Sequence, residues 1–225
     1  MDHVTPPGLT SPAAGAWYRR PEARSWRTDS PATSVLAFHR QMAGYAATPL
    51  TEVPALAQEL NVGRVFVKAE SRRFGLPAFK ILGASYAIAR ALSRRYGLGE
   101  RAAPLAELAG RTAGDGDLRL SAATDGNHGR AVARVAAELG VPAGIFVPAA
   151  ITSAAKQAIA AEGAALFELE LPYDDVVARA AELARAGGAG HLIVQDTSWP
   201  GYEEIPRWIA DGYSTLFAET DRQLA

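Results

Sequence analysis

Chemistry that needs a primary amine has three candidate residues in this chain of 225 residues, because its only lysines are Lys68, Lys80 and Lys156. Lys156 lies on a predicted amphipathic helix, which favours a solvated surface charge, and Lys68 lies in a strand-like segment. Lys80 follows Pro-Ala-Phe and precedes Ile-Leu-Gly, an apolar setting at the entrance to a helix. Partial desolvation there favours the neutral, nucleophilic amine of a Schiff-base lysine. The alternative is a structural lysine, whose stem covers apolar surface while its ammonium group reaches water. The local sequence alone favours this alternative.

A second chemical segment, residues 121–129 (SAATDGNHG), joins a predicted strand to the start of a predicted helix. Free backbone N–H groups at a helix start bind anions, and Gly126 and Gly129 let the backbone approach a ligand closely. Asn127 offers a donor and an acceptor to a ring hydroxyl or an oxyanion. Asp125 is a candidate proton acceptor if its surroundings bury it. The structural alternative is an Asp-Gly turn that caps the helix.

A third segment, residues 194–202 (VQDTSWPGY), follows the last predicted strand and carries a second acid, Asp196. Its structural alternative is a loop in which Trp199 and Tyr202 are packing residues. The carboxyl ends of parallel strands meet at one edge of a sheet, where α/β proteins bind ligands. We therefore expect Asp125 and Asp196 to lie at the same crevice.

The elements that position these residues alternate regularly in the second half of the chain. The pattern predicts strands at 118–123, 144–148, 165–170 and 191–195, and helices at 129–139, 153–162 and 173–186. Such alternation is typical of right-handed βαβ units, so we expect an α/β fold with an open, twisted parallel sheet and flanking helices.

Upstream of the alternating region the pattern is less regular. Helices are expected at 34–43, after Thr51 and at 83–95, a strand at 64–70, and a polar, glycine-rich connection at 97–117. Residues 1–34 are rich in Pro, Gly, Ser and Thr and predict an irregular N-terminal arm, part of which, with Trp17, Tyr18 and Trp26, packs onto a neighbour.

Composition excludes several classes of function. Twenty-three basic and 24 acidic residues give a net charge of −1, which provides no global field for nucleic acid or an anionic membrane. The chain has no cysteine, which excludes disulfides and zinc–thiolate sites and fits a cytoplasmic location. No signal peptide or membrane-spanning run is visible. No second ligand stands at metal spacing from His128, so we expect a structural histidine and no metal site.

Three segments together carry a family resemblance: residues 74–86 (FGLPAFKILGASY), 123–129 (ATDGNHG) and 194–202. They resemble pyridoxal-phosphate enzymes of the tryptophan-synthase-β group (fold type II), and within it the diaminopropionate ammonia-lyases. The resemblance runs from about Phe38 to the C-terminus. Threonine dehydratases have a similar loop with a small residue where Asp125 stands, so this acid favours the diaminopropionate branch.

The resemblance implies pyridoxal 5'-phosphate as the cofactor and gives four residues a part in binding it. Lys80 would form the Schiff base with the cofactor, and Asn127 would hydrogen-bond its ring hydroxyl. Phe79 and Gly126 belong to the same two family segments and would contact the cofactor.

The implied reaction is the α,β-elimination of 2,3-diaminopropionate to pyruvate and ammonia, with the cofactor ring as electron sink. Asp125 would serve as base for one enantiomer of the substrate and Asp196 for the other, with Lys80 available for proton transfer. An aspartate suits this task only if desolvation raises its pKa towards neutrality. The helix start at Gly129 would act on Asp125 in the opposite direction.

The resemblance further implies that the glycine-rich phosphate-binding loop lies downstream of a helix near residues 212–224, and no such loop occurs in this sequence. We therefore expect a small α/β domain at 83–199 and an incomplete second domain at 35–82 and 200–225. The expected partners are a small amino-acid substrate and either a second copy of the chain or a complementing C-terminal segment. Two alternatives remain: a catalytically incomplete remnant that binds a partner, and a serine or threonine deaminase, against which Asp125 argues.

Overall fold

Four parallel strands form the sheet that carries two of the three chemical segments. The strands are β3 (Arg119–Ala123), β4 (Ala143–Pro148), β5 (Ala165–Leu169) and β6 (His191–Ile193), and their order in the sheet is β5-β4-β3-β6. All three pairings are parallel, with Leu120 opposite Ala143 on one side of β3 and opposite Leu192 on the other. The predicted parallel α/β sheet is therefore confirmed. The computed structural model describes residues 32–225, so nearly all of the predicted arm, with its three aromatic residues, lies outside the described residues.

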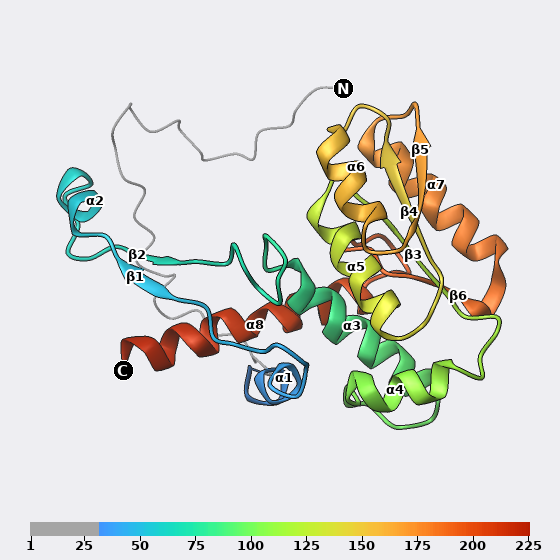
Figure 1. The fold of residues 1–225 in the computed structure, drawn as a ribbon, viewed down its shortest axis with the longest axis horizontal. Coiled ribbons are helices and arrows are strands. Elements are labelled where there is room, and N and C mark those ends of the chain that lie inside the picture. The colour runs from blue at the N-terminus through green and yellow to red at the C-terminus, as the bar shows by residue number, and fades with distance from the viewer. Residues whose placement is uncertain (1–31) are drawn as a thin grey trace. The chain divides into compact units, whose positions relative to one another are not determined.

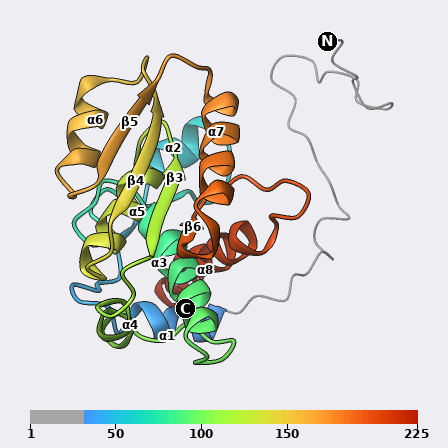
Figure 2. The ribbon, with the colours of Figure 1, turned by 90° about the vertical axis from the view of Figure 1, so that its right-hand side faces the viewer.

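The helices cover the sheet from both sides. Helices α5 (Asn127–Glu138) and α6 (Ser153–Ala160) lie on one face, and α7 (Tyr173–Ala186) lies on the other (Figures 1 and 2). The chain runs outward from β3 to β4 and β5 with helices on the first face. It then returns along α7 and a short 3-10 turn, η2 (Gly188–Gly190), to place β6 beside β3. Because the direction of travel reverses between β3 and β6, their carboxyl ends form the crevice where such sheets bind ligands.

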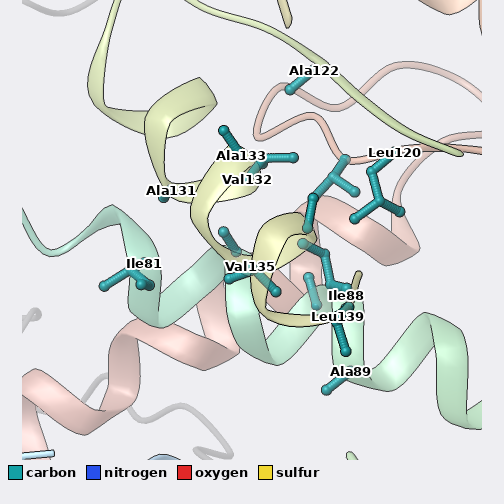
Figure 3. Close-up of a cluster of buried hydrophobic side chains, with 14 of the residues drawn as sticks. Ile81, Ile88, Ala89, Leu120, Ala122, Ala131, Val132, Ala133, Val135 and Leu139 are labelled. Atoms are coloured by element: carbon teal, nitrogen blue, oxygen red, sulfur yellow. The ribbon is translucent and has the colours of Figure 1, made fainter. Parts of the chain in front are cut away.

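The core lies between the sheet and helix α3 (Lys80–Arg95), which packs against α5 and α8 (Glu204–Leu224). The predicted apolar face of α5 is fully turned inward, with Val132, Val135, Ala136 and Leu139 all at most 2% exposed. Figure 3 shows Val132, Val135 and Leu139 in one buried cluster with Ile88 of α3 and Leu120 of β3. Burial of each large aliphatic side chain contributes about 1.5–3 kcal/mol, so this contact fixes α3, and with it Lys80, relative to the sheet.

A smaller region precedes α3 in the chain. Helix α1 (Ala32–His39) packs on α8, and strands β1 (Leu50–Glu52) and β2 (Phe66–Lys68) form an antiparallel pair with α2 (Pro54–Glu59) between them in sequence. The end of α8 is fastened to this region by the buried Glu219, which accepts hydrogen bonds from Arg73 at 2.8 Å and from the Tyr45 hydroxyl at 2.9 Å. Lys68 completes the cluster with an ion pair to Glu219 at 2.8 Å.

The structure corrects the sequence reading at four elements. A helix, α4 (Leu105–Thr112), lies inside the predicted connection at 97–117, because Leu108 and Thr112 give this short segment one buried side. Helix α3 begins at Lys80, three residues before the predicted start. Helix α8 begins at Glu204, upstream of the helix expected near residues 212–224. Pro206 is tolerated there because it falls in the first turn, where its missing N–H costs no hydrogen bond. Strand β1 has no predicted counterpart; its three residues are mostly exposed and carry little pattern.

Two further observations concern the whole described part. Residues 32–225 belong to one compact unit, and the division into a domain at 83–199 and a partial one at 35–82 and 200–225 stays a prediction. None of the helices in the described residues is both long enough and apolar enough to cross a membrane.

Candidate active site

Lys80 is the first residue of α3 and points to the end of β6. Its Nζ donates a hydrogen bond to Oδ2 of Asp196 at 2.9 Å, across 116 residues of sequence. The Lys80 side chain is 31% exposed and the Asp196 side chain 19%. The lysine amine also lies 5.8 Å from the ring centre of Phe79 and 5.7 Å from that of Tyr213. The amine therefore stands between a carboxylate and two aromatic rings, at the rim of the crevice.

The position of Asp196 is fixed by its neighbours after β6. The Tyr202 hydroxyl accepts the backbone N–H of Gln195 and donates to the carbonyl of Ile193, both at 2.8 Å. The fully buried Gln195 side chain accepts the backbone N–H of Ala123 at 2.9 Å. These bonds tie the chain after β6 to the end of β3, so Asp196 has little freedom relative to the sheet.

The pair of Lys80 and Asp196 is electrostatically coupled. Burial acts to lower the pKa of Lys80, but the hydrogen bond and negative charge of Asp196 raise that pKa above its ordinary value. Burial acts to raise the pKa of Asp196, but positive charge on His128 or Lys80 lowers it below its ordinary value. The resting pair is therefore an ammonium and a carboxylate. The neutral amine that partial desolvation alone favours is opposed by this pairing, because the partner of Lys80 is an acid 116 residues away in sequence.

The other candidate acid, Asp125, lies on the loop between β3 and α5. Asp125 and Asn127 are exposed and Gly126 is partly exposed. Apart from Gly126 itself and its two chain neighbours, no described atom lies within 4 Å of the place that a Cβ on Gly126 would take, which agrees with the predicted close approach of a ligand. Gly129 differs: a Cβ there would collide with the Thr124 side chain and lie 2.7 Å from Ile145, so this glycine serves packing.

The start of α5 is already capped. The Thr124 hydroxyl accepts the N–H groups of Gly126 at 3.0 Å and Gly129 at 3.1 Å. Two of the free N–H groups expected for an anion at this helix start are therefore occupied. The side chain of Asn127 and the open space beside Gly126 remain as the polar features that face solvent there.

Two tyrosines outside the three predicted segments lie close to this site. Burial raises the pKa of Tyr173, and the charges of Asp196 and then Asp125 raise it further, so its hydroxyl lies within electrostatic range of both. Tyr213 packs its ring edge-on against Phe79, with 5.0 Å between ring centres. Tyr213 follows Ile209 by four residues on α8, a spacing that places both on the side facing α3. That spacing could have indicated Tyr213 had the helix been predicted from residue 204.

The other two lysines belong to separate clusters. Lys156 donates to Glu168 at 2.6 Å and to the carbonyl of Ala149 at 2.8 Å, so it is paired on the surface rather than simply solvated. Lys68 is bound to Glu219. Within residues 32–225 no group of three His, Asp or Glu side chains is arranged to hold a metal ion.

The comparisons with known proteins agree with this geometry. The model of the family "Pyridoxal-phosphate dependent enzyme" matches residues 42–225, and the chain belongs to that family. It is 41% identical over 193 residues to diaminopropionate ammonia-lyase of Salmonella typhimurium, covering 85% of this chain and 47% of the relative. The chain thus spans about half the length of this relative, and likewise 46% of the 40% identical diaminopropionate ammonia-lyase of Escherichia coli strain K12.

Solved structures give the same result. The apo form of Escherichia coli diaminopropionate ammonia-lyase superposes with a TM-score of 0.79 and 39% identity, over 87% of this chain and 53% of that chain. The same enzyme in complex with an aminoacrylate-PLP azomethine reaction intermediate gives a TM-score of 0.76 and 38% identity, over 87% and 48%. The resemblance predicted from three short segments is therefore confirmed over most of the chain.

Proposed function

We propose that this chain carries the lysine and the acids of a pyridoxal 5'-phosphate site that eliminates ammonia from 2,3-diaminopropionate. The observation that carries the proposal is the hydrogen-bonded pair of Lys80 and Asp196 at the crevice beside β3 and β6, in a chain 41% identical to a diaminopropionate ammonia-lyase. The overall reaction consumes the diamino acid and one water and yields pyruvate and two molecules of ammonia.

The residues present suit the cofactor. Lys80 would hold it covalently through Nζ, and the partly exposed Phe79 ring lies directly beside that amine. Asn127 is exposed at the start of α5 with donor and acceptor atoms available for a ring hydroxyl. The free Cβ position of Gly126 would let the cofactor approach the backbone there. When bound, the cofactor would supply an electron sink for a carbanion at the substrate Cα.

The chain's own residues would manage the protons. Asp196 is ionised at rest and lies 2.9 Å from Lys80, so it is placed to accept a proton from a substrate held at that amine. Asp125 lies exposed on the loop between β3 and α5, so it would act as a base only once the bound cofactor and substrate cover it. Two acids on different loops provide a base for each hand of the substrate.

Covalent trapping tests the cofactor part of the proposal. The full chain is incubated with pyridoxal phosphate, reduced with borohydride and digested, and the peptides are analysed by mass spectrometry. We expect a phosphopyridoxyl group on Lys80, none on that peptide in Lys80→Arg, and unchanged labelling in the matched variant Lys156→Arg. Labelling spread equally over Lys68, Lys80 and Lys156 would refute a specific site.

A pyruvate assay tests the substrate part. Both enantiomers of 2,3-diaminopropionate are compared with serine and threonine at equal concentration. We expect the diamino acid to be turned over faster, with Asp125→Asn and Asp196→Asn each impairing one enantiomer more than the other. Faster turnover of threonine would instead support the deaminase reading.

A second candidate function, binding of another polypeptide, is favoured by the far end of α8. Phe217 is 68% exposed and Leu224 50% exposed, an unusual exposure for large apolar side chains on one helix. We propose that a second copy of the chain or a complementing C-terminal segment covers them. Analytical ultracentrifugation of the chain alone distinguishes these: a dimer that Phe217→Glu dissociates supports the second copy, and a monomer excludes it.

A further inference from the structure

The ring of His128 has one nitrogen that makes no hydrogen bond within the described residues. The side chain is 5% exposed and lies in the first turn of α5, directly after Asn127. Its Nε2 lies 2.7 Å from the carbonyl oxygen of Val194, whereas its Nδ1 is buried without a partner. A buried polar atom left unpaired costs about 1–3 kcal/mol, so such an atom calls for an explanation.

The contact with Val194 fixes which nitrogen carries the proton. A carbonyl oxygen only accepts hydrogen bonds, so Nε2 of His128 is the donor and carries hydrogen. In the neutral ring Nδ1 then holds a lone pair. This nitrogen faces Oδ2 of Asp196 at 3.7 Å. Two acceptors therefore confront each other, and the arrangement is favourable only when a proton lies on one of them.

The same carboxylate oxygen has a second neighbour. Lys80 Nζ lies 2.9 Å from Asp196 Oδ2, so this oxygen stands between the lysine and the histidine. While Lys80 is an ammonium, its charge compensates Asp196. Burial lowers the pKa of His128, the Asp196 charge and the Val194 bond oppose this, and the Lys80 charge lowers it further. The hydroxyls of Tyr173, Tyr202 and Tyr213 also interact electrostatically with Asp196, and that of Tyr213 interacts with Lys80 as well.

We propose that His128 is a positioning residue for Asp196, and that its Nδ1 takes up a proton from Asp196 Oδ2 whenever Lys80 no longer supplies a positive charge there. Asp196 is a carboxylate at rest, so it must first accept a proton from the substrate. The transfer then moves that proton: the O–H bond formed on Asp196 breaks, an N–H bond forms on Nδ1, and an imidazolium–carboxylate pair results. The reverse transfer returns the proton. Asp196 is thereby restored as a base without exchange with solvent. The role of Asp196 as a base for the substrate rests on the proposed function, but the proton coupling between Asp196 and His128 does not.

The coupling is tested in the chain without cofactor, by nuclear magnetic resonance of ring nitrogens in ¹⁵N-histidine-labelled protein. Lys80→Met removes the amine charge while keeping an unbranched side chain. We expect the proton affinity of His128 to rise about tenfold or more in Lys80→Met, because Asp196 then faces the ring alone. In the double variant Lys80→Met/Asp196→Asn this rise is expected to disappear. Equal pH midpoints for the titration of the His128 ring in the wild type and in Lys80→Met would overturn the proposal.

Two substitutions of His128 separate positioning from structure. In His128→Gln the amide nitrogen can still donate to Val194, but no acceptor faces Asp196, whereas His128→Asn keeps a polar group near Nδ1 and loses the Val194 bond. We expect His128→Gln to fold as the wild type does and to shift the pH dependence of pyruvate formation for one enantiomer of diaminopropionate only. His191→Gln is the matched control, since the His191 ring is bonded to Ser121 at 2.9 Å on another part of the sheet. An equal effect of His128→Gln on both enantiomers would count against the proposal. The nuclear magnetic resonance titration of His128 needs no turnover, so failure of the proton coupling can be told apart from failure of the proposed function.

Discussion

Gly83 of α3 and Gly212 of α8 face each other with no side chain between the two helices. A Cβ placed on Gly212 would lie 2.7 Å from the Cα of Gly83 and 2.5 Å from the carbonyl oxygen of Leu82. Both obstacles are main-chain atoms at the start of α3, so neither can swing aside. This contact holds α8, which carries Tyr213, against the first turn of the helix that begins with Lys80.

Gly212→Ala is therefore expected to destabilise the chain. A methyl group forced into a packed helix contact costs about 1–3 kcal/mol, which exceeds the gain in helix propensity. The free energy of unfolding is measured by urea denaturation. Gly110→Ala in α4 is the matched control, because nothing lies within 4 Å of its Cβ position. We expect this variant to gain about 0.5–1 kcal/mol, and an equal gain in both variants would show that the helices separate easily.

The sequence was sufficient for the parts of the fold that depend on local pattern. The apolar face of α5, with Val132 and Leu139, identified this helix because burial on one side repeats every three to four residues. The convergence of Asp196 on the crevice followed from a general property of parallel sheets, which requires only the order of strands and helices. Lys80 was singled out by the family segment around it, because its apolar flanks alone favoured a surface lysine.

The parts that could not be predicted depend on contacts between distant residues. Nothing near Glu219 in sequence shows that it is buried, because its partner Arg73 lies 146 residues away. Tyr213 lies on α8, whose first two turns contain Pro206 and lack a clear start signal. The resting charge of Lys80 was likewise set by Asp196 rather than by its own neighbours in the chain.

The charge of Asp196 should control the reactivity of Lys80. Burial acts to lower the pKa of Lys80, and the Asp196 hydrogen bond and charge raise it above its ordinary value. In Asp196→Asn the burial remains without the opposing charge, so the pKa of Lys80 falls and more neutral amine is present at pH 8. We expect faster acylation of Lys80 by acetic anhydride, followed by mass spectrometry across pH. Glu168→Gln removes the acid beside Lys156 and should leave the Lys80 rate unchanged. A Lys80 rate that stays the same in Asp196→Asn would contradict the coupling.

His39 should make stability depend on pH between about 4 and 6.5. Its ring is fully buried and bonded to Thr215 at 2.7 Å and to the Leu82 carbonyl at 3.0 Å. Burial lowers the pKa of His39 to about 4 in the folded chain, against 6.5 when exposed. The unfolded chain then binds the extra proton, so stability is full above pH 6.5 and is lost as pH falls towards 4. The loss amounts to about 3 kcal/mol.

Urea unfolding at pH 7.5 and pH 4.5 measures this dependence. The wild type is expected to lose more stability on acidification than His39→Gln, which has no proton to bind at this site. His191→Gln is the comparison, because His191 is only partly buried and should retain most of the acid sensitivity. An identical loss in the wild type and His39→Gln would show that another group controls acid unfolding.

Glu219 should be the most sensitive charged residue for the attachment of α8. Its side chain is 2% exposed, and it is paired with Arg73, which is 1% exposed, and with Lys68. Burial acts to raise the pKa of Glu219, but the hydrogen bonds from Arg73 and Lys68 lower it to about 2. The carboxylate therefore stabilises the fold fully above its ordinary pKa of 4.5, and this contribution is lost as pH falls towards 2.

Glu219→Gln removes the charge while keeping the shape, and it leaves Arg73 buried with Glu70 as its remaining carboxylate within bonding distance in the described chain. Breaking a buried pair from one side costs about 3–5 kcal/mol. Glu182→Gln is the matched control, since the ion pair of Glu182 with Arg179 is more than half exposed on both sides and contributes at most about 0.5 kcal/mol. Urea denaturation at pH 7 measures both. Because Glu219 joins α8 to the segment containing Arg73, we also expect faster amide hydrogen exchange at the end of α8 in Glu219→Gln. Equal stability of the two variants would mean that apolar packing alone holds the helix.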